Sequence, residues 1–241
     1  MRHAIVHIGL EKTGTSSLQE FLQLNRSELL ARQAICVPDF MGRGSQWPLA
    51  VLAYDSDRSD DLTAPLGDSD SRQCRLEEIR QQIQAFVHQH PGSTCCFSSE
   101  HLSSRLTTER ELIRLRSFLV DLFDTITIVL YLREPIRLAI SRSSTFVKMG
   151  LGAFQLPSPQ EFGSVFDFAA IIKLWQSVFP DSLRIRLFDP GAPGFDLIGD
   201  FCDAIGIEDS SHYERPLRVN ESLDWTVMRL LSRINLIALE Q

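Results

Sequence analysis

Ile5-Val6-His7-Ile8-Gly9-Leu10-Glu11-Lys12-Thr13-Gly14-Thr15-Ser16-Ser17-Leu18 is the part of this chain with the clearest structural pattern. The apolar run over residues 4–8 predicts a short buried strand, and the residues from Thr15 onward open an amphipathic helix. Gly9 and Gly14 frame the loop between them. Such a loop directs several backbone N–H groups, and the positive end of the helix dipole, toward one point. The sequence therefore predicts an anion site near the start of the chain.

The loop differs at one position from the phosphate-binding loop of nucleotide kinases and hydrolases. That loop reads G-x-x-x-x-G-K-[ST]; Gly9, Gly14 and Ser16 keep its frame, whereas Thr15 stands where the lysine is expected. The lysine lies inside the loop instead, as Lys12. In this form the loop resembles the 5′-phosphosulfate-binding loop of sulfotransferases that use 3′-phosphoadenosine 5′-phosphosulfate (PAPS). For this stretch alone, the alternative is an ordinary strand-turn-helix with a chance lysine.

A second motif follows the most continuous apolar run, Thr125–Leu132, which is typical of a central parallel strand covered on both faces. Arg133 ends that strand, Pro135 suits the first turn of a helix, and Ser141 follows two turns later. Ligands of such sheets bind outside the carboxyl ends of the strands, and the planar arginine fork suits phosphate. R-x-P with this serine resembles the 3′-phosphate-binding motif of sulfotransferases. A helix-capping arginine and a surface serine are the alternative.

The resemblance implies a role for each residue of the two motifs. Lys12 would contact the bridging and sulfuryl oxygens of PAPS, and Arg133 with Ser141 would hold its 3′-phosphate. The 5′-phosphate would lie against the N–H groups and hydroxyls of the loop. The implied cofactor-binding residues are Lys12, Thr13, Gly14, Thr15, Ser16, Ser17, Arg133 and Ser141. PAPS is then the cosubstrate and no metal is required, because a sulfuryl group carries less charge than a phosphoryl group.

Glu100-His101 lies just past a further predicted strand, 93–99, in the order Ser98-Ser99-Glu100-His101, and supplies the candidate general base. Carbohydrate sulfotransferases commonly use a glutamate near this place, whereas hormone and phenol sulfotransferases use a histidine. The order of the residues resembles the glutamate type, so Glu100 is favoured over His101, and Lys12 completes the catalytic set. The alternative for Glu100 is a helix-capping carboxylate. The resemblance implies in-line transfer of a sulfuryl group to an acceptor hydroxyl of a small molecule or glycan, with a carbohydrate or glycolipid favoured.

The resemblance is weaker over the rest of the chain. Trp175–Phe188 suits the helix and late strand of the family, although Phe188-Asp189 replaces the usual Tyr-Glu. Residues 218–223 resemble a segment that closes over the 3′-phosphate in some members. Residues 146–162, which contain glycines and prolines, predict a loop over the acceptor site.

Strand and helix patterns alternate along the chain, which predicts an α/β fold: a three-layer sandwich with a central parallel sheet and a P-loop-like strand-loop-helix. A further strand is predicted at 34–37, in addition to those at 4–8, 93–99 and 125–132. Helices are predicted at 15–32, 71–90, 107–123 and 225–240. Residues 39–71 predict a long irregular loop. Its acidic run, Asp55–Asp61, is interpreted as a solvated surface rather than a metal site.

Composition limits the class of protein. The chain of 241 residues suits one α/β domain over residues 1–241, with 44% hydrophobic and 23% charged residues. The net charge of −7 argues against a general nucleic-acid binder. No apolar run reaches the ~18 residues of a membrane helix, and the first strand begins too early for a signal peptide, so we expect a cytoplasmic protein. The chain stops inside a helical pattern, which leaves open that C-terminal residues are missing.

The cysteines and histidines add no further site. The five cysteines show neither metal-ligand spacing nor a paired framework, and adjacent Cys95 and Cys96 are interpreted as small buried hydrophobic residues. His7, inside the first strand, is interpreted as a core histidine.

Two other functions compete with sulfuryl transfer. A nucleotide or small-molecule kinase with a degenerate phosphate-binding loop would bind ATP with magnesium, and the lysine displaced from position 15 to position 12 argues against it. A non-catalytic module would bind PAPS without transferring the sulfuryl group. The sequence fixes neither the acceptor nor the oligomeric state.

Overall fold

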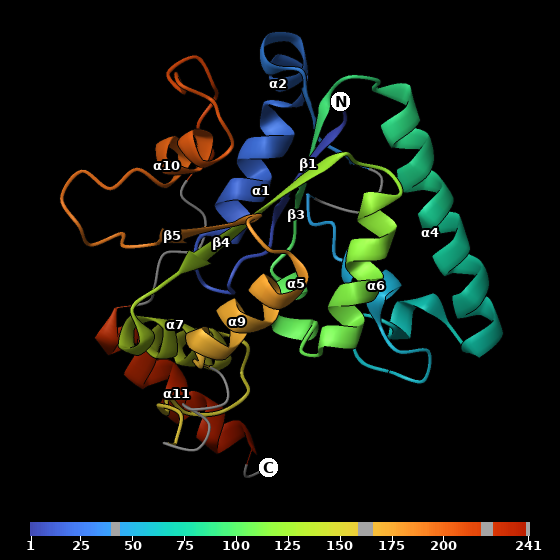
Figure 1. The fold of residues 1–241 in the computed structure, drawn as a ribbon. Helices are drawn as coiled ribbons and strands as arrows, with labels where there is room; N and C mark the ends of the chain where they lie inside the picture. Colours follow the sequence, from blue (N-terminus) through green and yellow to red (C-terminus); the bar gives the residue numbers. More distant parts are fainter. Residues whose placement is uncertain (40–43, 159–165, 218–223, 240–241) are drawn as a thin grey trace.

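The computed structural model of the protein describes residues 1–39, 44–158, 166–217 and 224–239. Figure 1 shows helices packed around a central sheet. The strands are β1 (His3–His7), β2 (Ile35–Cys36), β3 (Thr94–Ser98), β4 (Thr125–Leu132) and β5 (Leu183–Leu187). The helices are α1 (Thr15–Leu24), α2 (Arg26–Gln33), α3 (Pro48–Ala53), α4 (Ser69–Gln89), α5 (His101–Arg105), α6 (Glu109–Val120), α7 (Pro135–Lys148), α9 (Phe168–Val178), α10 (Leu197–Ala204) and α11 (Trp225–Leu239), with a 3-10 turn at Ala64–Leu66.

The strands form one parallel sheet in the order β2-β3-β1-β4-β5. β1, which leads into the glycine loop, lies at the centre, with His7 opposite Ser98 of β3 and Val129 of β4. One hydrophobic core packs the sheet against α3, α4, α6 and α9, and a second packs the other face against α1, α2 and α10 (Figure 1). The predicted α/β fold with a central parallel sheet is confirmed.

The continuous apolar run of β4 follows from burial on both faces of the sheet. Ile128 and Leu130 belong to the first core, while Val129 and Tyr131 belong to the second. Successive side chains of a strand point to opposite faces, so a strand covered on both sides has no polar alternation. The strand β4 could therefore be read from sequence with its observed bounds.

The predicted helix over 15–32 is wrong in one respect, because the structure divides it at Asn25 into α1 and α2. The Asn25 side chain donates to the carbonyls of Phe21 (2.8 Å) and Glu214 (2.9 Å) and accepts from the Glu214 N–H (2.8 Å). Asn25 thus fastens a distant segment to the end of α1. Helical periodicity continues across the break, which is why the local pattern did not reveal it.

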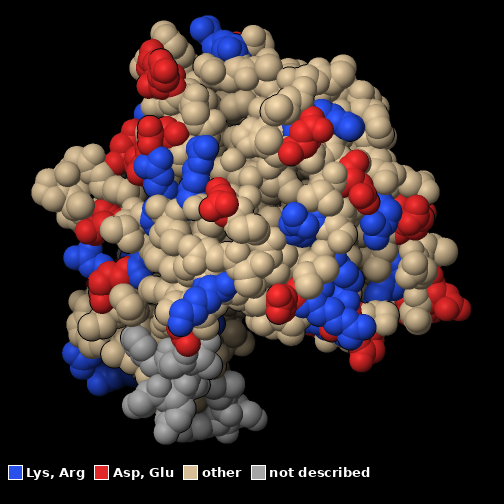
Figure 2. All heavy atoms as spheres, viewed as in Figure 1, with Lys and Arg blue, Asp and Glu red and all other residues tan. Residues whose placement is uncertain are grey.

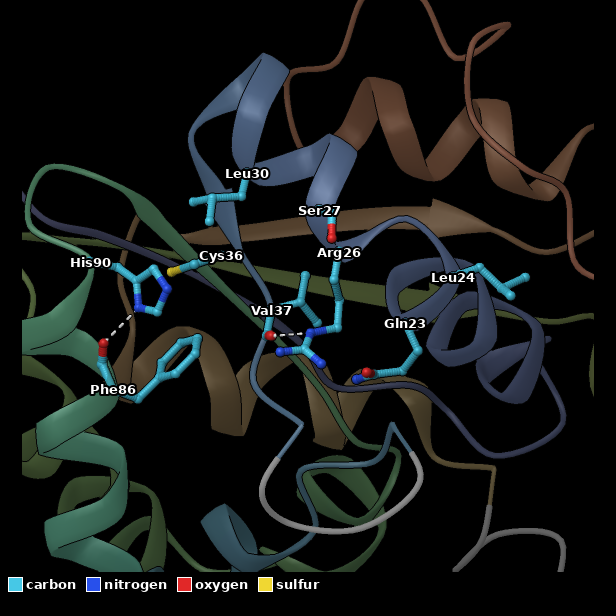
Figure 3. A pocket seen from close by; sticks show the side chains of 9 residues that line it. All are labelled: Gln23, Leu24, Arg26, Ser27, Leu30, Cys36, Val37, Phe86 and His90. Carbon is cyan, nitrogen blue, oxygen red and sulfur yellow. Dashed lines mark hydrogen bonds between the residues drawn. The ribbon is translucent and has the colours of Figure 1, made fainter.

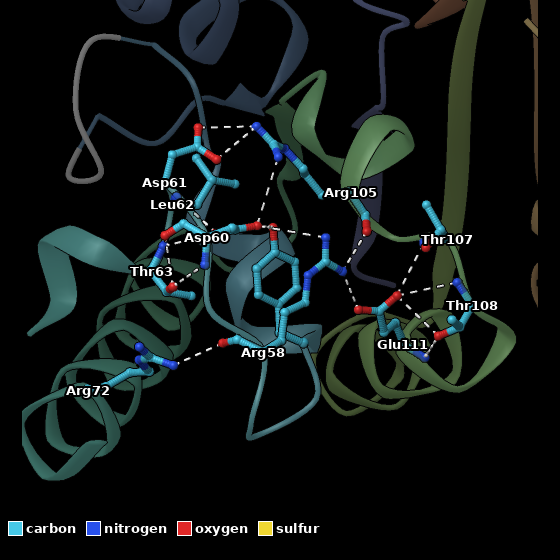
Figure 4. A network of polar contacts seen from close by, with 11 residues as sticks. Arg58, Asp60, Asp61, Leu62, Thr63, Arg72, Arg105, Thr107, Thr108 and Glu111 are labelled. Atoms are coloured by element: carbon cyan, nitrogen blue, oxygen red, sulfur yellow. Dashed lines mark hydrogen bonds and ion pairs between the residues drawn. The ribbon is translucent and has the colours of Figure 1, made fainter. Parts of the chain in front are cut away.

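Residues 39–71 are more regular than predicted, since they contain α3, the 3-10 turn and the start of α4. The acidic run is also more than the solvated surface expected (Figure 4). Arg58 pairs with Asp60 (3.7 Å) and with the buried Glu111 of α6 (2.5 Å), and it donates to the Arg105 carbonyl (2.7 Å). Arg105, the last residue of α5, pairs with Asp60 in turn (4.0 Å). These contacts tie the segment to α5 and α6.

Asp60 is ionised within this network. Burial alone would raise the pKa of its carboxyl group, but hydrogen bonds from the Tyr54 hydroxyl (2.9 Å) and from backbone N–H groups outweigh burial and lower the pKa. The network is therefore intact at neutral pH and is weakened as pH falls through the lowered pKa.

Other expectations for the chain have mixed outcomes. The helix α7 continues to Lys148, so the predicted loop at 146–162 begins later, and its residues 159–162 lie outside the described part of the chain. The segment 218–223 also lies outside it. Among the described residues, no helix combines the length and hydropathy needed to span a membrane. On the face seen in Figure 2, acidic and basic side chains are interspersed.

Replacing Glu111 by Ala should lower the free energy of unfolding by about 2–4 kcal/mol, because Arg58 and the N–H groups of Thr107 and Thr108 lose a buried acceptor. Urea unfolding measures the change. Glu109→Ala, in the same first turn but exposed, is the matched control and should change stability by less than about 0.5 kcal/mol. Equal losses in the two variants would contradict a structural role for this network.

Candidate functional site

The glycine loop joins β1 to α1 at the carboxyl end of the central strand. Its first residues still pair with β4, through Tyr131 N–H to the Gly9 carbonyl (2.7 Å) and Leu10 N–H to the Tyr131 carbonyl (3.0 Å). Gly9, Lys12 and Gly14 then take positive φ values of 87°, 63° and 80°. A positive φ is unusual for a lysine and costs about 1–2 kcal/mol of backbone strain, so the surrounding contacts must hold Lys12 in this conformation.

The start of α1 presents donors that no described group uses. The N–H groups of residues 14–17 make no hydrogen bond to any described atom, and Gly14 gives the helix no side-chain cap. Four unsatisfied N–H groups at the positive end of a helix are suited to bind an anion. Ser16 is exposed and Ser17 partly exposed, and their hydroxyls make no hydrogen bond to the described residues.

The two threonines of the loop have a different part from the serines. Thr13 and Thr15 are buried, and both hydroxyls donate to the Leu10 carbonyl, at 2.5 and 3.1 Å. These hydrogen bonds fold the loop back on its own start. The implied contact of the Thr15 hydroxyl with a phosphate therefore competes with a bond inside the loop, whereas the backbone N–H groups and the Ser16 hydroxyl remain available.

Arg133, at the end of β4, lies against this loop. Its guanidinium donates through Nη1 to the Lys12 carbonyl (2.8 Å), and its buried Nε makes no hydrogen bond to the described residues. The Phe188 ring, just after β5, lies 5.2 Å from the guanidinium carbon. Burial lowers the pKa of Arg133, and the neighbouring charge of Arg137 adds to the effect. A half-buried guanidinium with an unused donor is suited to a second anion next to the first.

The helix after Arg133 is capped by Glu134, whose carboxylate accepts from the N–H groups of Ile136 (2.9 Å) and Arg137 (2.7 Å). The alternative in which Arg133 caps the helix is therefore wrong. Arg142 of α7 pairs with Glu11 of the glycine loop (3.6 Å). Ser141, the residue before it, is partly exposed and forms no side-chain hydrogen bond within the described chain. No described contact joins Ser141 to Arg133 or Lys12.

Glu100 also lies beside the glycine loop. A Cβ added to Gly9 would stand 2.9 Å from the Cα and Cβ of Glu100, so the two backbones approach closely. Glu100 occupies the N-cap position of α5, but its carboxylate makes no capping hydrogen bond, which makes the capping-carboxylate alternative wrong. Its carboxylate accepts instead from Nε2 of the buried Gln19 (2.9 Å). His101 is partly buried, and its Nδ1 makes no hydrogen bond to a described residue.

Buried glutamines connect this corner of the site. Gln46 accepts from the Ser98 N–H (2.6 Å) through its side chain and donates its own N–H to the Ser98 carbonyl (3.0 Å). Gln46 thereby extends the sheet beside the end of β3, at the point where Glu100 leaves it. The Gln19 side chain also reaches the Ser98 carbonyl (3.5 Å). The position of Glu100 is thus held by α1, β3 and the segment after β2.

His7 is a core histidine, as predicted from the sequence. It is fully buried, its Nδ1 contacts the Ser98 hydroxyl (2.8 Å), and its Nε2 makes no hydrogen bond to a described group. Burial lowers the pKa of His7 to about 3, so the ring is neutral at neutral pH. It packs edge-on against Tyr131 and Phe201.

The structure brings Lys12, Arg133 and Glu100 to one edge of the sheet. Sequence reasoning missed Gln19, Gln46 and Phe188. A signal existed for Gln19, since it is a polar residue next to Leu18 on the buried face of the predicted helix. Gln46 gave no local signal, because its partner is distant along the chain. The only signal for Phe188 in the sequence was that it replaces the tyrosine usual in the family.

Replacing Gly9 by Ala should destabilise the protein by about 2–4 kcal/mol, since the strain of a positive φ adds to a clash with Glu100. Gly150→Ala is the matched control: Gly150 has φ of 76°, but a Cβ there meets nothing within 4 Å, so only the backbone strain of about 1–2 kcal/mol applies. Chemical denaturation compares the two variants. Similar losses would mean that Gly9 and Glu100 are not in close contact.

Comparisons with known proteins concern the fold. No protein-family model matches the chain, and no curated protein matches it in sequence. In structure it is similar to a sulfotransferase from Alicyclobacillus acidocaldarius, with a TM-score of 0.50 and 18% identity over 98% of this chain and 94% of that one. It is also similar to the sulfotransferase domain from the curacin biosynthetic pathway, with a TM-score of 0.46 and 14% identity over 86% of this chain and 75% of that one. The first of these two likenesses shows that the protein has the fold of sulfotransferases.

Proposed function

We propose that this protein is a PAPS-dependent sulfotransferase that moves a sulfuryl group to an acceptor hydroxyl. The hydrogen bond from Arg133 to the Lys12 carbonyl carries the proposal. It supports two anion-binding groups side by side, one on the glycine loop and one at the end of β4, as a nucleotide with a 5′-phosphosulfate and a 3′-phosphate requires. The fold of sulfotransferases supports the same conclusion.

The unused donors fit the two ends of such a nucleotide. The N–H groups of residues 14–17, the Ser16 hydroxyl and the Lys12 ammonium would bind the 5′-phosphosulfate. The Lys12 side chain forms no ion pair with any described carboxylate, so its charge is available. Arg133, through the guanidinium donors that do not bind the Lys12 carbonyl, would bind the 3′-phosphate, with Ser141 as a further donor.

The transfer needs a base on the acceptor side and positive charge on the leaving side. The acceptor oxygen would attack sulfur in line with the bond to the 5′-phosphate, and its proton would pass to Glu100. Charge that develops on the leaving phosphate would be stabilised by Lys12 and the N–H groups of α1. Glu100 is suited to the part of base because Gln19 occupies one carboxylate oxygen and orients the other. A glutamate base favours a carbohydrate or glycolipid hydroxyl as the acceptor.

Adenosine 3′,5′-bisphosphate should raise the thermal midpoint of the protein, and ATP with magnesium should raise it less. At 100 times its dissociation constant a ligand stabilises the fold by about 2.7 kcal/mol. Arg133→Ala should abolish the shift, while Arg116→Ala, exposed on α6, should keep it. A shift with magnesium-ATP alone would favour a kinase instead.

Glu100→Gln should still bind adenosine 3′,5′-bisphosphate. The rate at which it forms this bisphosphate from PAPS, measured with a panel of glycan acceptors, should fall by about 10²–10⁴-fold. Gln19→Met should lower turnover by about tenfold, which is about 1.4 kcal/mol of transition-state stabilisation, because the base loses its orientation. Gln23→Met, one turn later on α1, is the matched control and should leave turnover unchanged. Normal turnover in Glu100→Gln together with a loss in His101→Asn would assign the base to His101.

A further inference from the structure

Cys36 and Cys95 face each other across neighbouring strands. They are directly paired in the register of β2 with β3, and their sulfur atoms lie 3.0 Å apart within the same core. Neighbouring strands are about 4.7–4.9 Å apart, which falls within the Cα separation of about 4.4–6.8 Å that a disulfide spans. A covalent bond between the two sulfurs would therefore require little movement of the backbone.

The remaining cysteines have no such arrangement. Cys96 and Cys202 are buried in the opposite core, and no sulfur contact joins them among the described residues. Cys74 is exposed on α4. The chain thus contains one close thiol pair, two buried thiols that can serve as unreactive controls and one exposed thiol that reports general reactivity.

A groove gives access to one member of the pair. Cys36 is only 2% exposed, but it lines an open hollow of about 270 Å³ beside the edge strand β2. Figure 3 shows Cys36 in this groove, with Arg26 and Leu30 from the α2 side and Phe86 and His90 from the end of α4. A small molecule can enter, since a water molecule takes about 30 Å³. Cys95 does not line the groove.

The two thiols also differ in acidity. The hydrogen bond from Cys95 lowers the pKa of Cys36, and the same bond together with burial raises the pKa of Cys95. Arg26 lines the same groove, but its charge is paired with that of Asp39, so the Cys95 hydrogen bond is the main cause of the lowered pKa of Cys36. The thiolate is the reactive form of cysteine, so access and ionisation both favour Cys36 as the first thiol to react.

We propose that Cys36 and Cys95 form a redox-active dithiol, which a small hydroperoxide entering this groove oxidises to a disulfide between β2 and β3. In the first step the Cys36 sulfur attacks the peroxide. A sulfur–oxygen bond forms, the oxygen–oxygen bond breaks, and the leaving oxygen takes the thiol proton and departs as water or an alcohol. In the second step the Cys95 sulfur attacks the resulting sulfenic acid. The sulfur–sulfur bond forms, the sulfur–oxygen bond breaks, and water leaves with the Cys95 proton. The two thiols together lose two electrons, and the peroxide gains them.

The bond would link the edge strand to the strand that leads into the candidate active site. β3 ends at Ser98, two residues before Glu100, and Gln46, which follows β2 in the chain, pairs with Ser98. The chemistry of the thiol pair does not depend on sulfuryl transfer, so its test is independent of the proposed function.

The native wild-type chain would be treated with a small excess of hydrogen peroxide, and catalase would stop the reaction. The protein would then be unfolded in denaturant that contains an alkylating agent, so that free thiols are blocked. It would be digested, and its peptides would be identified by mass spectrometry. The expected product is a linked pair of peptides that contain Cys36 and Cys95, which dithiothreitol separates. Cys96 and Cys202 should be recovered alkylated. A bond between any other pair, or free Cys36 and Cys95 after Cys74 has been oxidised, would overturn the proposal.

Two variants and one probe sharpen the test. In Cys95→Ala, oxidation should stop at a sulfenic acid on Cys36 that a β-diketone traps; in Cys36→Ala, Cys95 should remain unreacted. Phenylarsine oxide, which bridges close thiols, should protect Cys36 and Cys95 of the native wild-type chain from alkylation and leave Cys74 reactive. Protection of Cys74 instead, or of no thiol, would contradict the pairing even if a variant failed to fold.

Discussion

The hydrogen bond from the Arg133 guanidinium to the Lys12 carbonyl is the contact on which the candidate site depends (2.8 Å). It joins the end of β4 to the loop that follows β1, and it supports a backbone conformation that a lysine seldom takes. Because the bond uses only one nitrogen of the guanidinium, Arg133 supports the loop and keeps other donors for the proposed 3′-phosphate.

The loop itself also divides its hydrogen-bonding groups between structure and a possible ligand. The hydroxyls of Thr13 and Thr15 are used to fold the loop onto Leu10, and the N–H groups of residues 14–17 are left for an anion. A loop whose conformation is fixed before the ligand arrives avoids part of the ordering cost of binding. On the other side of the loop, Gly9 allows Glu100 to approach. The anion site and the candidate base are therefore adjacent because both depend on the backbone of one short loop.

The sequence predicted what is local and missed what is distant. The strand-loop-helix, the bounds of β4 and the helix begun by Pro135 follow from patterns within a few residues, and all are present in the structure. The break at Asn25, the pairing of Gln46 with Ser98 and the ion pairs of Asp60 depend on partners far along the chain. The Cys36–Cys95 pair belongs to the same class, since only strand register brings the two thiols together. The roles of Lys12, Glu100, Arg133 and Ser141 stay predictions.

The most direct measurement is a crystal structure of the protein with adenosine 3′,5′-bisphosphate. We expect one bound nucleotide, with its 5′-phosphate on the N–H groups of residues 14–17 and near Lys12. Its 3′-phosphate should accept a hydrogen bond from the Arg133 guanidinium. The proposed function would be contradicted by a nucleotide that occupies another part of the surface. It would also be contradicted by one that contacts the loop while Arg133 contacts neither phosphate.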